Sequence, residues 1–113
     1  MTESSPAFAW RTRLRAELSS ARNARQPVRV AALRGALAAS DNAETSDASD
    51  TEGPNSSDTA RRVLTDAQIC ELVEAEIAER LDAADVVRSR GQHMRAETLR
   101  AEAEVLSDVL WCA

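Results

Sequence analysis

Residues 27–43 read PVRVAALRGALAASDNA, and the fold follows from this segment. Placed on a helix, the segment has two nearly opposite apolar faces, one large and one small, formed by Val30, Leu33 and Leu37 and by Val28, Ala32, Gly35 and Ala39. A helix that is apolar on two faces is packed on two sides, so we expect it to be the central helix. Gly35 costs about 1 kcal/mol relative to alanine in a helix interior, which predicts a close helix approach there.

Another helix is predicted on the N-terminal side of this segment. Ser5 and Pro6 have the residue types of an N-cap and a first helical position, and Pro27 disfavours helix in the residue before it. We therefore expect this helix to begin at Ser5 and Pro6 and to end within 23–26. Its apolar residues recur with the period of a helix, at Trp10, Leu14, Leu18 and Ala21.

Two further helices are predicted on the C-terminal side. Thr65 and Gln68 have the spacing of a capping box, which marks the start of the third helix. Gly91 has the residue type that stops a helix, so the third helix is expected to end near Arg90. The fourth helix is predicted over 92–110.

Residues 45–63 are predicted to form a flexible acidic loop between the second and third helices. Within 45–59 only Ala48 is apolar, so burial offers little to offset the entropy lost on ordering. The expected fold is all-α, a single antiparallel four-helix bundle that makes one domain of residues 1–113.

Composition narrows the class of protein. The chain has 113 residues and a net charge of −5, and its fourteen basic residues are all arginine. The first forty residues carry seven arginines against two glutamates, a net charge of +5. No stretch approaches the roughly 20 apolar residues of a membrane span, and no hydrophobic segment follows the polar N-terminus, so we expect a cytoplasmic protein without membrane contact. The absence of lysine excludes a lysine-dependent active site.

Residues able to bind a metal are few and scattered. Cys70 and Cys112 lie 42 positions apart, and His93 is the only histidine. A tetrahedral zinc site generally needs four such ligands, so we expect no metal, no cofactor and no catalytic constellation. Cys70 is interpreted as a small buried hydrophobe and His93 as a surface residue at a helix start.

Two charged residues fall inside the apolar stripe of the third helix. Glu76 and Arg80 are four residues apart, the spacing of a helical ion pair. An unpaired charge in such a stripe costs several kcal/mol, so the pair is predicted to join Arg34 in a buried network. The alternative is a binding groove for an anionic or peptide partner at this point.

Arginines also form a row on the first helix. Arg11, Arg15 and Arg22 fall within about 40° of one another when each residue turns the helix by about 100°. One interpretation is a solvated helix face. The other is a surface for RNA phosphates, which need only positive charge at intervals along one face.

Six short stretches, taken in order, resemble the motifs of YqeY-like proteins. They are RVAALRGAL (29–37), NAE (42–44), LTDAQI (64–69), EIAER (76–80), RG (90–91) and AEAEVL (101–106). The resemblance covers roughly residues 8–110. It implies an N-terminal helical bundle followed by a small tail domain, which the family shares with the B subunit of the glutamine-dependent Asp-tRNA/Glu-tRNA amidotransferase.

The resemblance also implies what such a protein would do. In the amidotransferase the tail domain touches tRNA, and the family carries the label of a carbon–nitrogen ligase with glutamine as amido donor. Where the family has Y-L-P, leading into the tail domain, this sequence has Val109, Leu110 and Trp111. We therefore expect only the helical module, without the tail domain.

These inferences predict a non-catalytic helical module that contacts tRNA, another RNA or a protein near tRNA-dependent amidation. One alternative is an accessory protein that binds a subunit of a glutamine-dependent amidotransferase, with catalysis on the other subunits. A second alternative is a self-associating interaction protein that uses Trp111 and the small-residue face of the central helix. The expected oligomeric state is a monomer or a weak homodimer.

Overall fold

The computed structural model describes residues 6–49 and 64–110, and in these ranges it contains four helices and no strand. The helices are α1 (Pro6–Asn23), α2 (Pro27–Ser49), α3 (Asp66–Ser89) and α4 (His93–Val109). The prediction of an all-α fold is confirmed. Ser5, Trp111, Cys112 and residues 50–63 of the predicted loop lie outside the described residues.

Three helix boundaries lie at residues predicted from the sequence, and each is set by a proline, a capping box or a left-handed glycine. Pro27 begins α2, and the turn before it includes Arg25 at a φ of 58°. At the start of α3, the Gln68 N–H donates to Thr65 Oγ1 at 3.1 Å and the Thr65 N–H donates to Gln68 Oε1 at 2.9 Å, which confirms the capping box. After α3, Gly91 adopts a φ of 83°, a left-handed conformation that favours glycine.

The second helix is longer than predicted, because α2 continues through residues 45–49. The prediction of a loop from residue 45 is therefore wrong for this part of the segment. Between Gly35 and Gly53 neither glycine nor proline interrupts the helix. In addition, the buried Glu44 carboxylate is ion-paired with Arg11 of α1 at 2.7 Å, which holds the chain in helix beyond the predicted end at Ala43.

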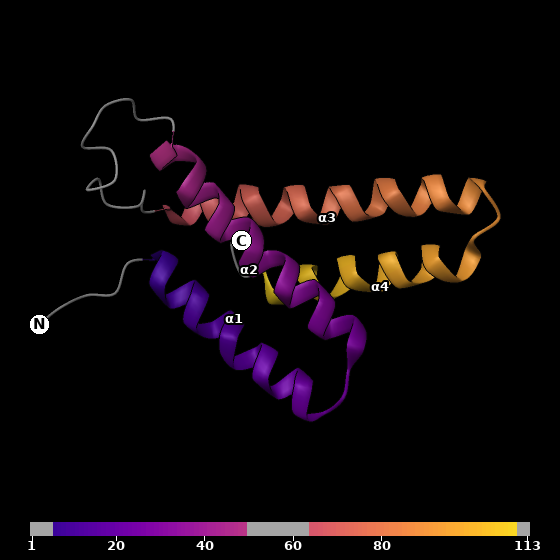
Figure 1. The fold of residues 1–113 in the computed structure, drawn as a ribbon, viewed down its shortest axis with the longest axis horizontal. Coiled ribbons are helices and arrows are strands. Elements are labelled where there is room, and N and C mark those ends of the chain that lie inside the picture. The colour runs from indigo at the N-terminus through magenta and orange to yellow at the C-terminus, as the bar shows by residue number, and fades with distance from the viewer. Residues whose placement is uncertain (1–5, 50–63, 111–113) are drawn as a thin grey trace, which may run out of the picture.

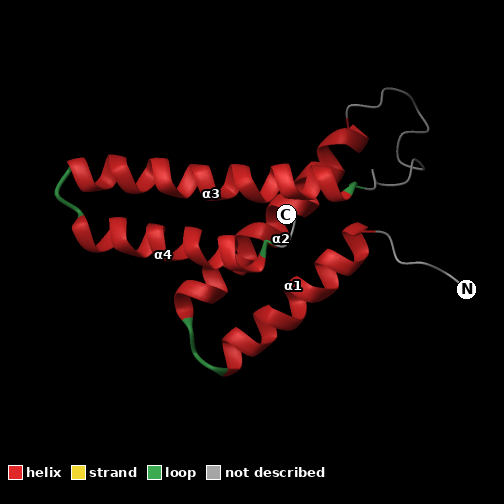
Figure 2. Ribbon diagram, turned by 180° about the vertical axis from the view of Figure 1, so that it is seen from behind, coloured by secondary structure: helices red, strands yellow, loops and turns green. Residues whose placement is uncertain are grey.

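The four helices form two hairpins that cross each other. In the α1–α2 hairpin and in the α3–α4 hairpin the two helices run in opposite directions, and α2 lies obliquely across α3 and α4 (Figure 1). The view from behind shows the same inclination (Figure 2). In a regular antiparallel four-helix bundle all four helices are nearly aligned with one common direction. Here the two hairpins are inclined to each other, so the four helices are not aligned in this way. α2 contacts α1, α3 and α4, as expected of a central helix. α3 also contacts the other three helices, but it meets α1 only slightly, whereas α2 packs substantially against both α1 and α4.

One apolar core joins the hairpins where they cross. The predicted stripe of α1 is buried throughout, with Trp10 at 1% exposure. The largest fully buried apolar side chains come from all four helices: Trp10, Leu14, Leu33, Val73 and Leu106. On α2, Ala32 and Ala36 are also fully buried, and such small side chains allow helices to approach closely.

Apolar side chains are exposed mainly towards the turn of the α3–α4 hairpin. Leu81, Val86 and Met94 lie there, and the buried residues of this half are only the small Ala84 and Ala96 among those described. Across residues 6–49 and 64–110 no helix combines the length and the apolar character needed to cross a membrane.

Candidate functional site

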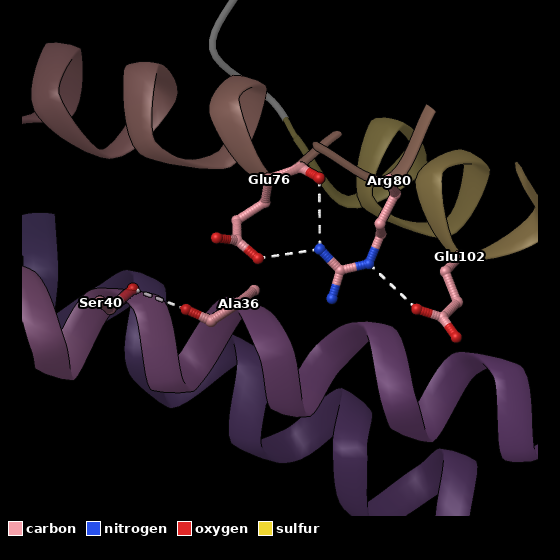
Figure 3. Close-up of polar contacts among 5 residues, drawn as sticks. All are labelled: Ala36, Ser40, Glu76, Arg80 and Glu102. Carbon is pink, nitrogen blue, oxygen red and sulfur yellow. Dashed lines mark hydrogen bonds and ion pairs between the residues drawn. The ribbon is translucent and has the colours of Figure 1, made fainter. Parts of the chain in front are cut away.

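The predicted pair of Glu76 and Arg80 lies where α3 faces both α2 and α4. Arg80 Nη1 donates to Glu76 Oε1 at 2.8 Å and to the Glu76 carbonyl oxygen at 3.2 Å. Arg80 Nε donates to Glu102 Oε1 of α4 at 3.0 Å (Figure 3). One guanidinium therefore links two carboxylates from two helices. We call Glu76, Arg80 and Glu102 the charged cluster.

Glu102 is a member of this cluster that was not predicted from the sequence. A signal for it exists in the turn of the hairpin, because Arg80 and Glu102 each lie eleven residues from Gly91. In an antiparallel hairpin, residues equidistant from the turn face each other. Glu102 also lies beside the inward-facing Leu99, Ala103 and Leu106 of α4, which directs it towards α3.

Burial makes this cluster more than a surface ion pair. The side chains of Arg80, Glu76 and Glu102 are 14%, 21% and 15% exposed. Burial by itself lowers the pKa of Arg80, but the hydrogen bonds and negative charges of Glu76 and Glu102 outweigh it, so this pKa is raised. Arg80 is therefore charged throughout the neutral pH range, and the cluster carries a net charge of −1.

Gly35 makes room for the guanidinium on α2. A Cβ atom added at Gly35 would overlap Arg80 Nη2, so the guanidinium would have to move. A close helix approach was predicted at Gly35, but the atoms nearest to it belong to side chains of α3, chiefly the guanidinium of Arg80, and not to a helix backbone. Gly35 is thus part of the site, because it leaves room for the Arg80 guanidinium beside the central helix.

Gly35→Ala is expected to lower the free energy of unfolding by about 1 kcal/mol, although alanine is the better helix former by about the same amount. The added methyl group displaces the Arg80 guanidinium, and charged hydrogen bonds are worth about 1.5–3 kcal/mol each. In an Arg80→Ala background the same substitution is expected to stabilise the protein by about 1 kcal/mol, because only the gain in helix propensity remains. Urea unfolding of all four proteins measures this change of sign. Equal effects in both backgrounds would contradict the role given to Gly35.

Arg34 is not part of the buried network, so this prediction is wrong. Its side chain is exposed, about 100° around α2 from Gly35, and no ion pair of Arg34 is found among the described residues. The third member of the cluster is Glu102 of α4 and not Arg34 of α2. The physical reason is that the crossing of the hairpins turns the Gly35 face of α2, and not the Arg34 face, towards α3.

The three arginines of the row on α1 have different surroundings. Arg11 forms ion pairs with Glu44 at 2.7 Å and Asp41 at 3.5 Å, and its side chain is 17% exposed. It therefore joins α1 to α2, and the prediction that it belongs to a free basic face is wrong. Arg15 and Arg22 are exposed, and in the described part of the chain neither has an ion pair.

The exposed arginines Arg15, Arg22 and Arg34 lie on the same side of the α1–α2 hairpin. On α2, Arg34 and Asp41 are seven residues apart and so share one face. Asp41 contacts Arg11, whose face on α1 also carries Arg15 and Arg22. Because α1 and α2 are antiparallel, Arg34 of α2 lies at the same height along the hairpin as the part of α1 between Arg15 and Arg22. We call these three residues the arginine strip.

A shallow groove lies on another face of α2, along the first turns of α3. Its volume is about 510 Å³. The apolar part of the lining is Ala39, Ala43, Leu72 and Ala75, and the polar part is Asn42, Gln68, Glu71 and Glu76. Glu76 thus belongs both to the charged cluster and to this groove, which we call the α2–α3 groove.

The described residues offer no metal centre. No group of three or more His, Cys, Asp or Glu side chains in residues 6–49 and 64–110 is placed to hold an ion. His93 is exposed at the first position of α4, as predicted. Cys70 is half-buried and disulfide-bonded, so its interpretation as a small buried hydrophobe is wrong.

No family model, no curated protein and no solved structure matches this chain. Its two distinctive surfaces are the arginine strip and the α2–α3 groove. Neither brings together a nucleophile, a base and an orienting group in the way that acyl- or amido-transfer chemistry requires.

Proposed function

We propose that this chain is a non-catalytic module that contacts the phosphate backbone of RNA through Arg15, Arg22 and Arg34. The observation that carries the proposal is the arginine strip, three exposed guanidinium groups without an ion pair among the described residues. The resemblance to YqeY-like proteins directs the proposal to tRNA, to a role near tRNA-dependent amidation and to the cytoplasm. The strip by itself supports contact with any RNA backbone.

The division of charge between the hairpins supports this assignment. Residues 6–49 carry seven arginines and four acidic residues, whereas residues 64–110 carry five arginines and eleven acidic residues. The net charges are therefore +3 and −6. A polyanion is attracted to the α1–α2 hairpin and repelled by the α3–α4 hairpin, so it is oriented before contact.

The strip is suited to phosphates rather than to bases. Arginine presents a planar fork of donors that binds phosphate oxygens in a bidentate manner. Arg15 and Arg22 are about 10 Å apart along α1, at 1.5 Å per residue, so one extended strand can contact both. Phe8 is the only exposed aromatic side chain among the described residues, and base stacking generally uses several. We therefore expect binding with little sequence preference.

The test is a titration of fluorescently labelled tRNA at low salt and at about 0.2 M salt. Replacing Arg15, Arg22 and Arg34 together by glutamine is expected to weaken binding at low salt at least tenfold. It should also reduce the slope of log K against log salt by about 2–3, since each phosphate contact contributes roughly 0.7–0.9. The matched control replaces the exposed Arg88, Arg90 and Arg95 by glutamine, which changes the net charge equally on the other hairpin.

The control variant is expected to bind tRNA with nearly the affinity of the unmodified chain. If both triple variants lose affinity equally, net charge and not the strip governs binding. If the unmodified chain binds no tRNA even at low salt, the RNA function is wrong, and the accessory role beside an amidotransferase subunit takes its place.

A further inference from the structure

The α2–α3 groove has the shape of a docking surface for a chain segment. It extends along α3 from Gln68 to Glu76, about 12 Å at 1.5 Å per residue. Its apolar lining is formed by three alanines and one leucine, so it is shallow and offers places for short aliphatic side chains between the helices. None of the lining residues is fully buried. A small molecule would remain largely in solvent there, whereas a peptide can lie along both helices.

The charge of the groove selects the kind of segment that binds. Its lining contains the carboxylates of Glu71 and Glu76 and no arginine. One carboxylate oxygen of Glu76 binds Arg80, and the second points away from that guanidinium (Figure 3). Glu71 is exposed on the solvent side of the groove. An anionic partner, one alternative expected from the sequence for this region, would meet the carboxylate of Glu71 and a charged cluster whose net charge is also negative.

We propose that the α2–α3 groove docks a basic segment of a partner protein, with small aliphatic side chains on the alanine floor and arginine or lysine against Glu71 and Glu76. The argument is the complementarity of charge together with the apolar floor. The partner is identified by this chemistry as an amphipathic stretch with cationic side chains beside an alanine- or leucine-rich face.

This inference is independent of the proposed RNA contact. On α2, the lining residues Ala39, Asn42 and Ala43 lie about 140°, 80° and 180° around the helix from Arg34. The groove and the arginine strip are therefore on different faces of the central helix and have opposite charge. Both surfaces can be occupied at once, which would make the chain an adaptor between an RNA and a basic protein segment.

The test uses two short synthetic peptides and backbone amide NMR of the full chain. The first peptide is a capped helix former with alanine and leucine on one face and arginine along its edges, and the second has glutamate in place of every arginine. The arginine peptide is expected to shift the amide signals of Ala39, Ala43, Leu72 and Ala75. The glutamate peptide should leave these signals unchanged.

Matched variants connect binding to the groove. Glu71→Gln is expected to weaken binding of the arginine peptide about two- to five-fold, which is the effect of losing one exposed ion pair. Glu74→Gln changes the charge equally on an exposed residue of the same helix that does not line the groove, so the affinity should be unchanged. Ala75→Trp fills the groove from an exposed position and is expected to abolish binding while the thermal midpoint is retained.

Four results would overturn the inference. Three of them concern the peptides: equal affinity for both, equal loss in Glu71→Gln and Glu74→Gln, or amide shifts confined to residues outside the groove. The fourth is a shift of the groove amides on adding tRNA alone, because the groove would then be part of an RNA surface. We expect tRNA alone to leave these signals unchanged. Loss of tRNA binding in the arginine-strip variant should leave peptide binding intact, so the two proposals can fail separately.

Discussion

Replacing Arg80 by alanine is expected to lower the free energy of unfolding by about 3 kcal/mol. The substitution leaves the carboxylates of Glu76 and Glu102 facing each other without the guanidinium that both of them bind. The side chains of Glu76 and Glu102 are 21% and 15% exposed, so water compensates for only part of the loss. It also leaves empty the space beside Gly35 that the guanidinium fills. Repulsion, desolvation and a void therefore act in the same direction.

Chemical denaturation at neutral pH measures this effect, with Arg100→Ala as the control. Arg100 is paired with Asp85 at 3.3 Å, but these side chains are 48% and 73% exposed. Loss of this exposed ion pair in Arg100→Ala should lower the free energy of unfolding by less than about 0.5 kcal/mol. Because the pKa of Arg80 is raised in the folded state, its contribution is fully present below the ordinary pKa of arginine, so the cost is the same across neutral pH. A cost as small as that of Arg100→Ala would mean that the charged cluster is not a stabilising element.

Replacing Trp10 by alanine is expected to lower the free energy of unfolding by about 3–5 kcal/mol. Trp10 is 1% exposed and is the largest fully buried side chain. It lies in the core cluster that joins α1 to residues of α2, α3 and α4. Its removal loses the transfer free energy of the ring and leaves a cavity that rigid helices cannot close. For a chain that is only marginally stable, such a loss approaches the whole free energy of folding.

Phe8→Ala provides the matched control, because it removes an aromatic ring from the same helix at 58% exposure. It is expected to cost less than about 1 kcal/mol. Circular dichroism at 222 nm during thermal and urea unfolding compares the two variants with the unmodified chain. If the two substitutions cost the same, α1 is not anchored to the core through Trp10, and the crossing of the hairpins depends on other contacts.

The candidate surfaces could be predicted from the sequence only where a contact is local. Glu76 and Arg80 are recognisable because their spacing of four residues places them one turn apart, whatever the helix packs against. Glu102 comes from another helix, and its distance from Arg80 depends on the register of the α3–α4 hairpin. In the same way, Arg11 belongs to a row on α1 by spacing, but its ion pairs come from α2.

Helix type and most helix ends can be derived from the chain alone, because capping, proline geometry and left-handed glycine act over a few neighbouring residues. The capping box at Thr65 and the stop at Gly91 are examples. The end of α2 cannot be derived in this way, since Glu44 is held by Arg11 from another helix. The crossing of the hairpins depends on how their ridges fit together, and helical periodicity contains no information on that fit. Tertiary packing therefore decides that Gly35 faces Arg80, that Arg34 faces solvent, and that α2 and α3 together form a groove.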